Sequence, residues 1–265
     1  MRSELPYSAK DLILDLLHSH PGPMTVQGFC KSAEVFGLAE QGVRVALNRL
    51  CATGLIERVG RGEYGFSQSA QTMSQEVQNW FEADARVTDW NGSWLAVHCA
   101  EVVRSERKGL RRHERALQLR GFRELRRDFW VRPNNLQGGC NAVGRDLYSL
   151  GLNPDALVLT LQDLQPELLA EATALWSVRE ISRSYRTLSE DLAQSLKRLR
   201  RMNNREAGAE VVFTSRKVIG QILSDPLLPD NLVPSQPRRD LVKQMQEYQV
   251  ISHEIWTRLL DGAAA

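Results

Sequence analysis

The chain has 265 residues, of which 42% are hydrophobic and 25% charged, and its formal net charge is +2. This ordinary globular composition allows two or three domains with a real core, and the net charge alone says little about partners. No stretch reaches the roughly 18 apolar residues that cross a membrane, and Glu4, Asp11 and Asp15 interrupt any signal-peptide pattern.

The four cysteines are not spaced as metal ligands or as a redox pair. They are Cys30, Cys51, Cys99 and Cys140. We therefore expect free thiols, which are typical of a reducing compartment, and a cytoplasmic protein.

Two short helices are predicted at the start of the chain. Ser8 can cap the first, with Asp11 at the return position of a capping box. Thr25 can cap the second, and Gly37 ends it.

A third helix is predicted from Gln41 to Gly54, with an apolar side and a polar side. Its inward positions follow the i, i+3, i+4, i+7 pattern and are Val43, Ala46, Leu47 and Leu50. The opposite side holds Gln41, Val45, Asn48 and Ala52, flanked by Arg44 and Arg49. Two short strands, 55–59 and 64–67, then follow and are joined by a glycine turn.

Three helices and a hairpin of this size predict a winged helix-turn-helix domain over residues 1–68. Arginine can bind guanine, asparagine can bind adenine, and Val45 can touch a thymine methyl group in the major groove. Arginines in the hairpin suit phosphates or the minor groove. The predicted DNA-binding residues are Gln41, Arg44, Val45, Asn48, Arg49, Arg58 and Arg61.

For each arginine taken alone, the alternative is ordinary solvated surface. Residues 1–67 carry seven Lys or Arg and seven Asp or Glu, so the predicted domain is formally neutral. Binding to double-stranded DNA would therefore depend on where the charges lie, and on a dimer.

A linker helix over residues 69–92 is predicted to lead into a central domain over residues 93–172. Its elements are a buried strand at 94–103, a helix at 106–121, a second strand at 122–133, a short helix at 139–151 and a third strand at 156–164. The β-α-β-α-β order indicates a split ferredoxin-like unit. The whole chain is thus predicted to be α+β.

Charge is concentrated in this central domain. Between Arg104 and Arg132 there are eleven Lys or Arg and four acids. This stretch can be a solvated face, an anionic-ligand site or a contact to the DNA backbone. The candidate effector-binding residues are Arg104, Arg107, Arg111, Arg112, Trp130 and Arg132, while Trp90, Trp94 and Trp176 can line a cavity or fill a core.

Catalytic signatures are weak in this sequence. The first central strand carries only Glu101, without the paired carboxylate that a metal nuclease needs. His98 in that strand fits a core position. We expect no catalytic residue, metal or cofactor. The alternative is a winged-helix protein whose nuclease-like ferredoxin domain acts on nucleic acid.

Residues 173–265 are predicted to form a helical C-terminal domain. One helix is expected to start at Ser189, with a stripe of Leu192, Leu196 and Leu199. An extended, proline-bound segment follows at 225–234, and a long amphipathic helix covers 240–260. The stripes can pack within the chain or build a dimer.

Three stretches resemble the phenylacetate-degradation repressor (PaaX) family. They are "RKGLRRHERALQLRGFRELRRDFWVRPNNL", "ALWSVREISRSYRTL" and "DPLLPDNLVP", and with the winged helix they span about nine-tenths of the chain. The family's Trp-Pro-Gly after the last stretch is replaced here by "SQPRRDL".

The resemblance implies a dimeric bacterial transcriptional regulator, usually a repressor of aromatic-compound catabolism genes. It also implies release from the operator by an aryl-acyl-CoA such as phenylacetyl-CoA. The implied fold adds a ferredoxin-like domain, related to CRISPR-associated small nucleases, and a helical C-terminal region.

Overall fold

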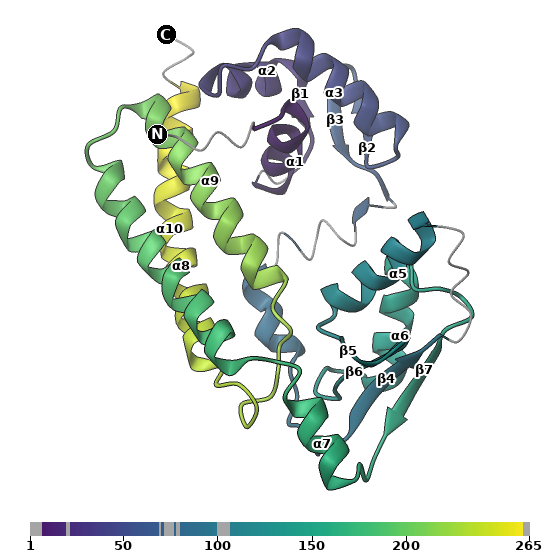
Figure 1. Cartoon of the computed structure of the whole chain (residues 1–265). Coiled ribbons are helices and arrows are strands. Elements are labelled where there is room, and N and C mark those ends of the chain that lie inside the picture. The colour runs from purple at the N-terminus through teal and green to yellow at the C-terminus, as the bar shows by residue number, and fades with distance from the viewer. Residues whose placement is uncertain are drawn as a thin grey trace. The chain divides into compact units, whose positions relative to one another are not determined.

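The computed structural model describes residues 7–19, 22–68, 70–71, 77, 80–99 and 107–261 (Figure 1). The chain forms two compact units, each built from separate stretches of sequence. Unit 1 comprises Met1–Trp80, Glu190–Ile219 and Gln244–Ala265, and unit 2 comprises Phe81–Ser189 and Gly220–Lys243. Helices and antiparallel sheets occur together, so the α+β class is confirmed. The two units divide the chain differently from the four sequential segments that the sequence suggested.

Unit 1 begins with three helices and a small antiparallel sheet. The helices are α1 (Ala9–Ser19), α2 (Val26–Val35) and α3 (Glu40–Ala52). The strands are β1 (Met24–Thr25), β2 (Ile56–Gly60) and β3 (Glu63–Phe66), in the order β1-β3-β2. The sequence predicted the β2–β3 hairpin to within a residue, but not the two-residue strand β1.

The helix ends follow the predicted signals. The backbone N–H of Asp11 donates to Ser8 Oγ (3.2 Å), and that of Ser8 donates to the Asp11 carboxylate (3.4 Å), which confirms the capping box. Thr25 Oγ1 accepts from Gly28 N at 3.0 Å. Gly37 follows α2 with φ of 67°, a left-handed conformation that a residue without Cβ adopts most easily.

Helices α8 (Val178–Leu199), α9 (Asn204–Leu223) and α10 (Gln236–Asp261) follow later in the chain, and each contributes residues to both units. The expected start at Ser189 is wrong, because α8 begins eleven residues earlier and Ser189 lies inside it. A serine at an expected cap position does not end a helix whose apolar stripe continues on both sides of it.

Within unit 1, α9 packs against the first helices. Arg216 lies 2.8 Å from the carboxylate of Asp11 and 3.5 Å from that of Asp15. The ring of Tyr7 lies 4.5 Å from that of Phe36 and 5.1 Å from that of Phe213. Ion pairs and aromatic contacts therefore attach the three-helix segment to α9.

Unit 2 contains a four-stranded antiparallel sheet among its described residues. The strands are β4 (Trp94–His98), β5 (Arg123–Arg126), β6 (Phe129–Pro133) and β7 (Leu157–Leu161), in the order β5-β6-β4-β7. Its helices are α5 (Arg107–Leu119), α6 (Gly139–Leu150) and α7 (Pro166–Thr173). Within the predicted linker helix, Trp80–Arg86 form a 3₁₀ helix, η1, whereas residues 87–92 are not helical. Residues 100–103 of the first predicted strand lie outside the described residues.

The single second strand predicted at 122–133 is wrong, because the chain turns back at Arg127 and Asp128 to form a β5–β6 hairpin. Asp128 has a positive φ of 60°, which a short polar side chain tolerates. The element order is therefore β-α-β-β-α-β, with one strand more than expected.

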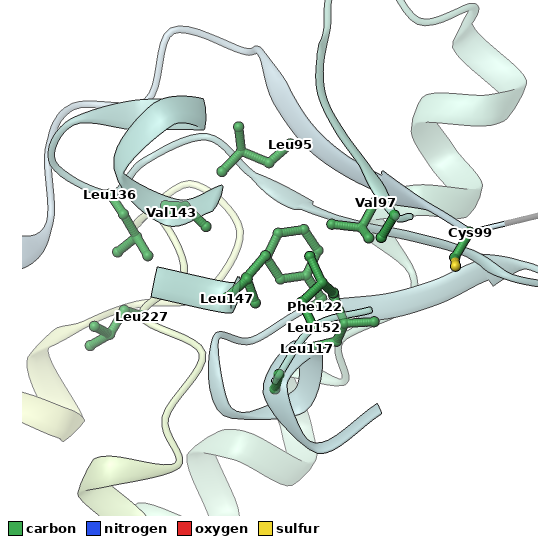
Figure 2. Close-up of a cluster of buried hydrophobic side chains, with 12 residues drawn as sticks. Leu95, Val97, Cys99, Leu117, Phe122, Leu136, Val143, Leu147, Leu152 and Leu227 are labelled. Carbon is green, nitrogen blue, oxygen red and sulfur yellow. The ribbon is translucent and has the colours of Figure 1, made fainter. Parts of the chain in front are cut away.

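Side chains alternate along the strands between two cores. Leu95 and Val97 face a cluster with residues of α5 and α6, in which the Phe122 ring lies close to Leu147 and Leu152 (Figure 2). The opposite face, around Trp94 and Ala96, packs against α7 and the segment after α9. Helices thus cover both faces of the sheet.

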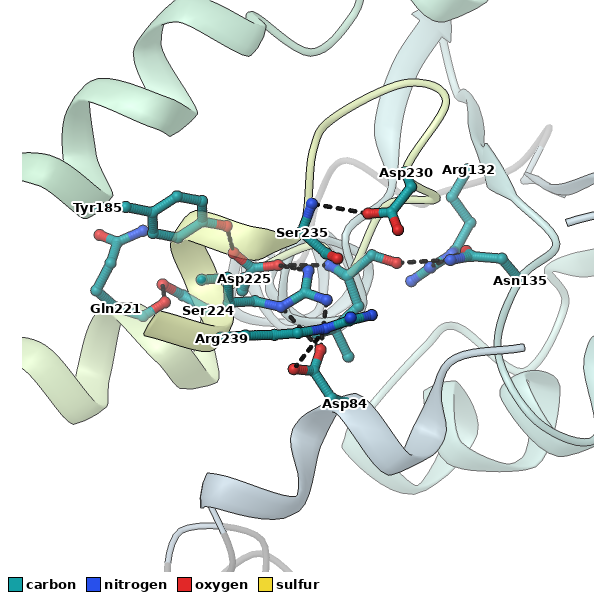
Figure 3. Close-up of polar contacts among 12 residues, drawn as sticks. Asp84, Arg132, Asn135, Tyr185, Gln221, Ser224, Asp225, Asp230, Ser235 and Arg239 are labelled. Atoms are coloured by element: carbon teal, nitrogen blue, oxygen red, sulfur yellow. Dashed lines mark hydrogen bonds and ion pairs between the residues drawn. The ribbon is translucent and has the colours of Figure 1, made fainter. Parts of the chain in front are cut away.

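The proline-rich segment 225–234 is held in unit 2 by a buried polar network (Figure 3). Arg238 pairs with Asp84 of η1, and its Nη1 lies 3.2 Å from the carboxylate of Asp225. Asp225 also accepts a hydrogen bond from the Tyr185 hydroxyl. Burial raises the pKa of Asp225, and the nearby Arg238 opposes that rise.

Candidate functional site

The outer face of α3 presents its polar residues to solvent. The buried positions of this helix are Val43, Ala46, Leu47 and Leu50, as the sequence predicted. The exposed positions include Gln41, Arg44, Val45, Asn48 and Arg49. The sequence-predicted residues on this helix therefore lie together on one exposed face.

Arg44 has a partner that the sequence interpretation missed. Its guanidinium contacts the Glu40 carboxylate one turn earlier, with N–O distances of 2.6 and 2.9 Å. Both side chains are more than half exposed, so water and salt weaken the pair and it can open when a phosphate or base competes. The i, i+4 spacing of Glu40 and Arg44 was the signal that could have revealed it.

The β2–β3 hairpin lies beside α3, because Ile56 is buried in the same core as the inner face of that helix. Gly62 closes the hairpin turn with φ of 79°, and its carbonyl accepts from Val26 N at 2.9 Å. Arg58 on β2 and Arg61 in the turn are exposed. The turn is thereby tied to the start of α2 while both arginine side chains stay in solvent.

The predicted effector residues do not share one surface. Arg104 and the side chain of Arg107 lie outside the described residues. Arg111 and Arg112 are exposed on α5. The side chain of Arg112 passes close to Gly151, since a Cβ atom added to that glycine would lie 3.1 Å from Arg112 Nε. Trp130 is partly buried against the core under α5 and α6.

Arg132 is buried and bound within the protein. Its guanidinium donates to Asn135 Oδ1 at 2.9 Å, to the Pro133 carbonyl at 3.0 Å and to the Arg120 carbonyl. Burial lowers the pKa of Arg132 to about 9, so the group stays cationic at neutral pH. These contacts give Arg132 a role in the core, away from the exposed arginines.

The tryptophans that could line a cavity pack in the core of unit 2. The Trp94 ring lies 6.1 Å from that of Trp176 and 5.6 Å from that of Trp90. All three belong to the cluster on the α7 side of the sheet, whereas Trp130 lies on the other side.

No group of three or more His, Cys, Asp or Glu side chains suited to a metal gathers among the described residues. His98 hydrogen-bonds through Nδ1 to the Asp128 carbonyl at 3.2 Å, and Glu101 lies outside the described residues. In the part of the chain that the structure describes, no helix is both long and apolar enough to span a membrane.

No family model matches this chain, and no curated protein matches it significantly. A solved structure, the uncharacterized protein Rv0674 from Mycobacterium tuberculosis, is similar in fold, with a TM-score of 0.62 and 20% sequence identity. The similarity covers 96% of this chain and 99% of that chain. At this identity the similarity supports the fold alone.

Proposed function

We propose that this protein is a cytoplasmic DNA-binding transcriptional regulator whose first three helices and β2–β3 hairpin act as a winged helix-turn-helix. The observation that carries the proposal is the outer face of α3, where polar side chains remain exposed while the opposite side is buried. A helix of this kind can enter the major groove with its side chains against base edges. Arg58 and Arg61 then contact the sugar-phosphate backbone from the hairpin.

The second part of the proposal concerns unit 2 and the direction of regulation. The β-α-β-β-α-β order supports a ferredoxin-like unit. The resemblance to the PaaX family supports a dimeric repressor of aromatic catabolism genes, released by an aryl-acyl-CoA effector. Arg111 and Arg112, which are exposed on α5, remain the candidate contacts for the phosphates of that effector.

The experiment is fluorescence anisotropy with duplexes from the DNA that flanks the gene. Asn48→Ala should weaken operator binding by about 1–3 kcal/mol and relax sequence preference at one position, because asparagine pairs specifically with adenine. The matched control is Asn141→Ala, which removes an exposed asparagine from α6 in unit 2. Equal affinity and equal preference in both variants would contradict the proposed role of α3.

A further inference from the structure

The turn between α8 and α9 and the helix ends beside it contain four arginines, and only some of these side chains have a partner among the described residues. Arg198 pairs with Glu210 at 2.5 Å, and Arg205 donates to the carbonyls of Glu34 and Val35 at 2.5 and 2.9 Å. The side chains of Arg200 and Arg201 are exposed and make no hydrogen bond or ion pair with a described residue. Of these four arginines, the two in the turn itself therefore remain available to a ligand.

The turn has a defined backbone. Arg201 N donates to the Arg198 carbonyl at 2.9 Å, which closes the end of α8. Asn203 caps the start of α9, since its side chain accepts from Glu206 N at 2.9 Å and its own N–H donates to the Glu206 carboxylate at 3.3 Å. Hydrogen bonds at both helix ends fix the path of the backbone between them.

Arg205 places this turn against the end of α2. The two carbonyls that it contacts belong to the last turn of α2, where a cation also satisfies acceptors that lack partners within the helix. Residues 36–39 follow directly and lead into the start of α3. In a helix-turn-helix, base contacts come from the first residues of the recognition helix, which lie between the two phosphate backbones.

The formal charge of residues 1–67 is the reason to expect a DNA phosphate contact at this turn. Residues 1–67 are formally neutral, and Arg44 is already paired with Glu40. Affinity for DNA depends heavily on cations that replace the counterions of phosphates. A formally neutral domain gains this favourable free energy of counterion release when another segment of the same unit adds unpaired arginines beside it.

We propose that Arg200 and Arg201 bind phosphates of the DNA backbone next to the groove that α3 enters. The DNA-binding surface of unit 1 then combines residues from the start of the chain with a turn about 150 positions later. This inference rests on the proposed function and extends it with a phosphate-binding site that lies outside the winged helix. Arg205 acts as a positioning residue, because it holds the turn and not the DNA.

The test compares salt dependence for three double variants. Arg200→Ala with Arg201→Ala should weaken binding to all duplexes alike and reduce the slope of log K against log salt by about two units, one for each lost phosphate contact. Arg200→Lys with Arg201→Lys keeps the charges and should keep most of the slope. Arg179→Ala with Arg183→Ala removes two exposed arginines, whose side chains pair with no described residue, from the part of α8 in unit 2 and should leave the slope unchanged.

The outcomes separate the inference from the proposed function. If the unchanged protein binds DNA and the Arg200/Arg201 alanine variant keeps the full slope, the inference is wrong while the proposed function stands. An equal loss in the Arg179/Arg183 variant also overturns it, because overall charge then explains the effect. If the unchanged protein binds no duplex, the proposed function fails and the inference fails with it.

Discussion

His113 shows how burial at a single residue makes stability depend on pH. The side chain is 3% exposed, and its Nδ1 accepts a hydrogen bond from Asn153 N at 3.3 Å. Burial lowers the pKa of this imidazole below its ordinary value, and the acceptor role at Nδ1 also requires an unprotonated nitrogen. The folded protein therefore holds His113 in its neutral form.

We predict that His113 contributes to a loss of stability as the pH falls below about 6.5, the ordinary pKa of histidine. Below that value the unfolded chain takes up a proton that the folded chain does not, so protonation favours unfolding. Urea denaturation at pH 7.5 and 6.0 should show a smaller difference for His113→Gln than for the unchanged protein. His253→Gln, at an exposed position of α10, is the matched control, and an equal effect of both changes would contradict this assignment.

At the scale of elements, the β2–β3 hairpin differs from α3 in what it can recognise. The arginines of the hairpin lie on an exposed strand and its turn, where they can reach phosphates of any sequence. We predict that Arg58→Ala and Arg61→Ala each weaken binding to all duplexes alike and each reduce the salt slope by about one unit. Anisotropy titrations at several salt concentrations measure this, and a changed base preference at an unchanged slope would argue against it.

The segment after α9 depends on its buried ion pairs. Arg238 and Asp225 are 4% and 2% exposed, so removal of the arginine leaves a buried carboxylate without its cation. We predict that Arg238→Met lowers the free energy of unfolding by about 3–5 kcal/mol. Arg239→Met removes an arginine that is 55% exposed and 3.8 Å from Asp84, and it should cost at most about 1 kcal/mol. Thermal or urea unfolding checks both values, and similar losses would show that burial of the pair is not decisive.

Local sequence patterns predicted those elements whose signals are local. The apolar spacing of α3 and the caps at Ser8, Thr25 and Gly37 agree with the structure because neighbours in sequence form them. The turn at Asp128 was missed, since the flanking residues favour strands on both sides and the turn has no glycine or proline. The start of α8 was missed because Ser189 resembles a cap when its tertiary contacts are unknown.

At the scale of the whole molecule, the spacing of apolar residues along the sequence could not predict how the chain divides into two units. Each contains stretches that lie far apart in sequence, such as α1 and α9, which Asp11 and Arg216 connect. The same limit applies to the candidate effector residues. Charge density grouped Arg111 with Arg132. The side chain of Arg111 is exposed on a helix, whereas that of Arg132 is buried and hydrogen-bonded within the protein. Burial, which decides between a ligand contact and a core contact, depends on tertiary packing.

The last prediction concerns the response to an effector. A ligand changes DNA affinity only if it binds two arrangements of the protein unequally, and such coupling is typically about 1–3 kcal/mol. Helices α8, α9 and α10 each contribute residues to both units, so a change in unit 2 has a covalent route to unit 1. We predict that an aryl-acyl-CoA at micromolar concentration releases the protein from its operator, whereas free CoA and the free acid do not.

Arg111→Glu or Arg112→Glu should weaken this response and leave DNA binding largely unchanged. Arg186→Glu, at an exposed position of α8 in the same unit, should leave both unchanged. Calorimetry that detects no aryl-acyl-CoA binding to folded, DNA-competent protein would refute the effector while the DNA-binding proposal stands.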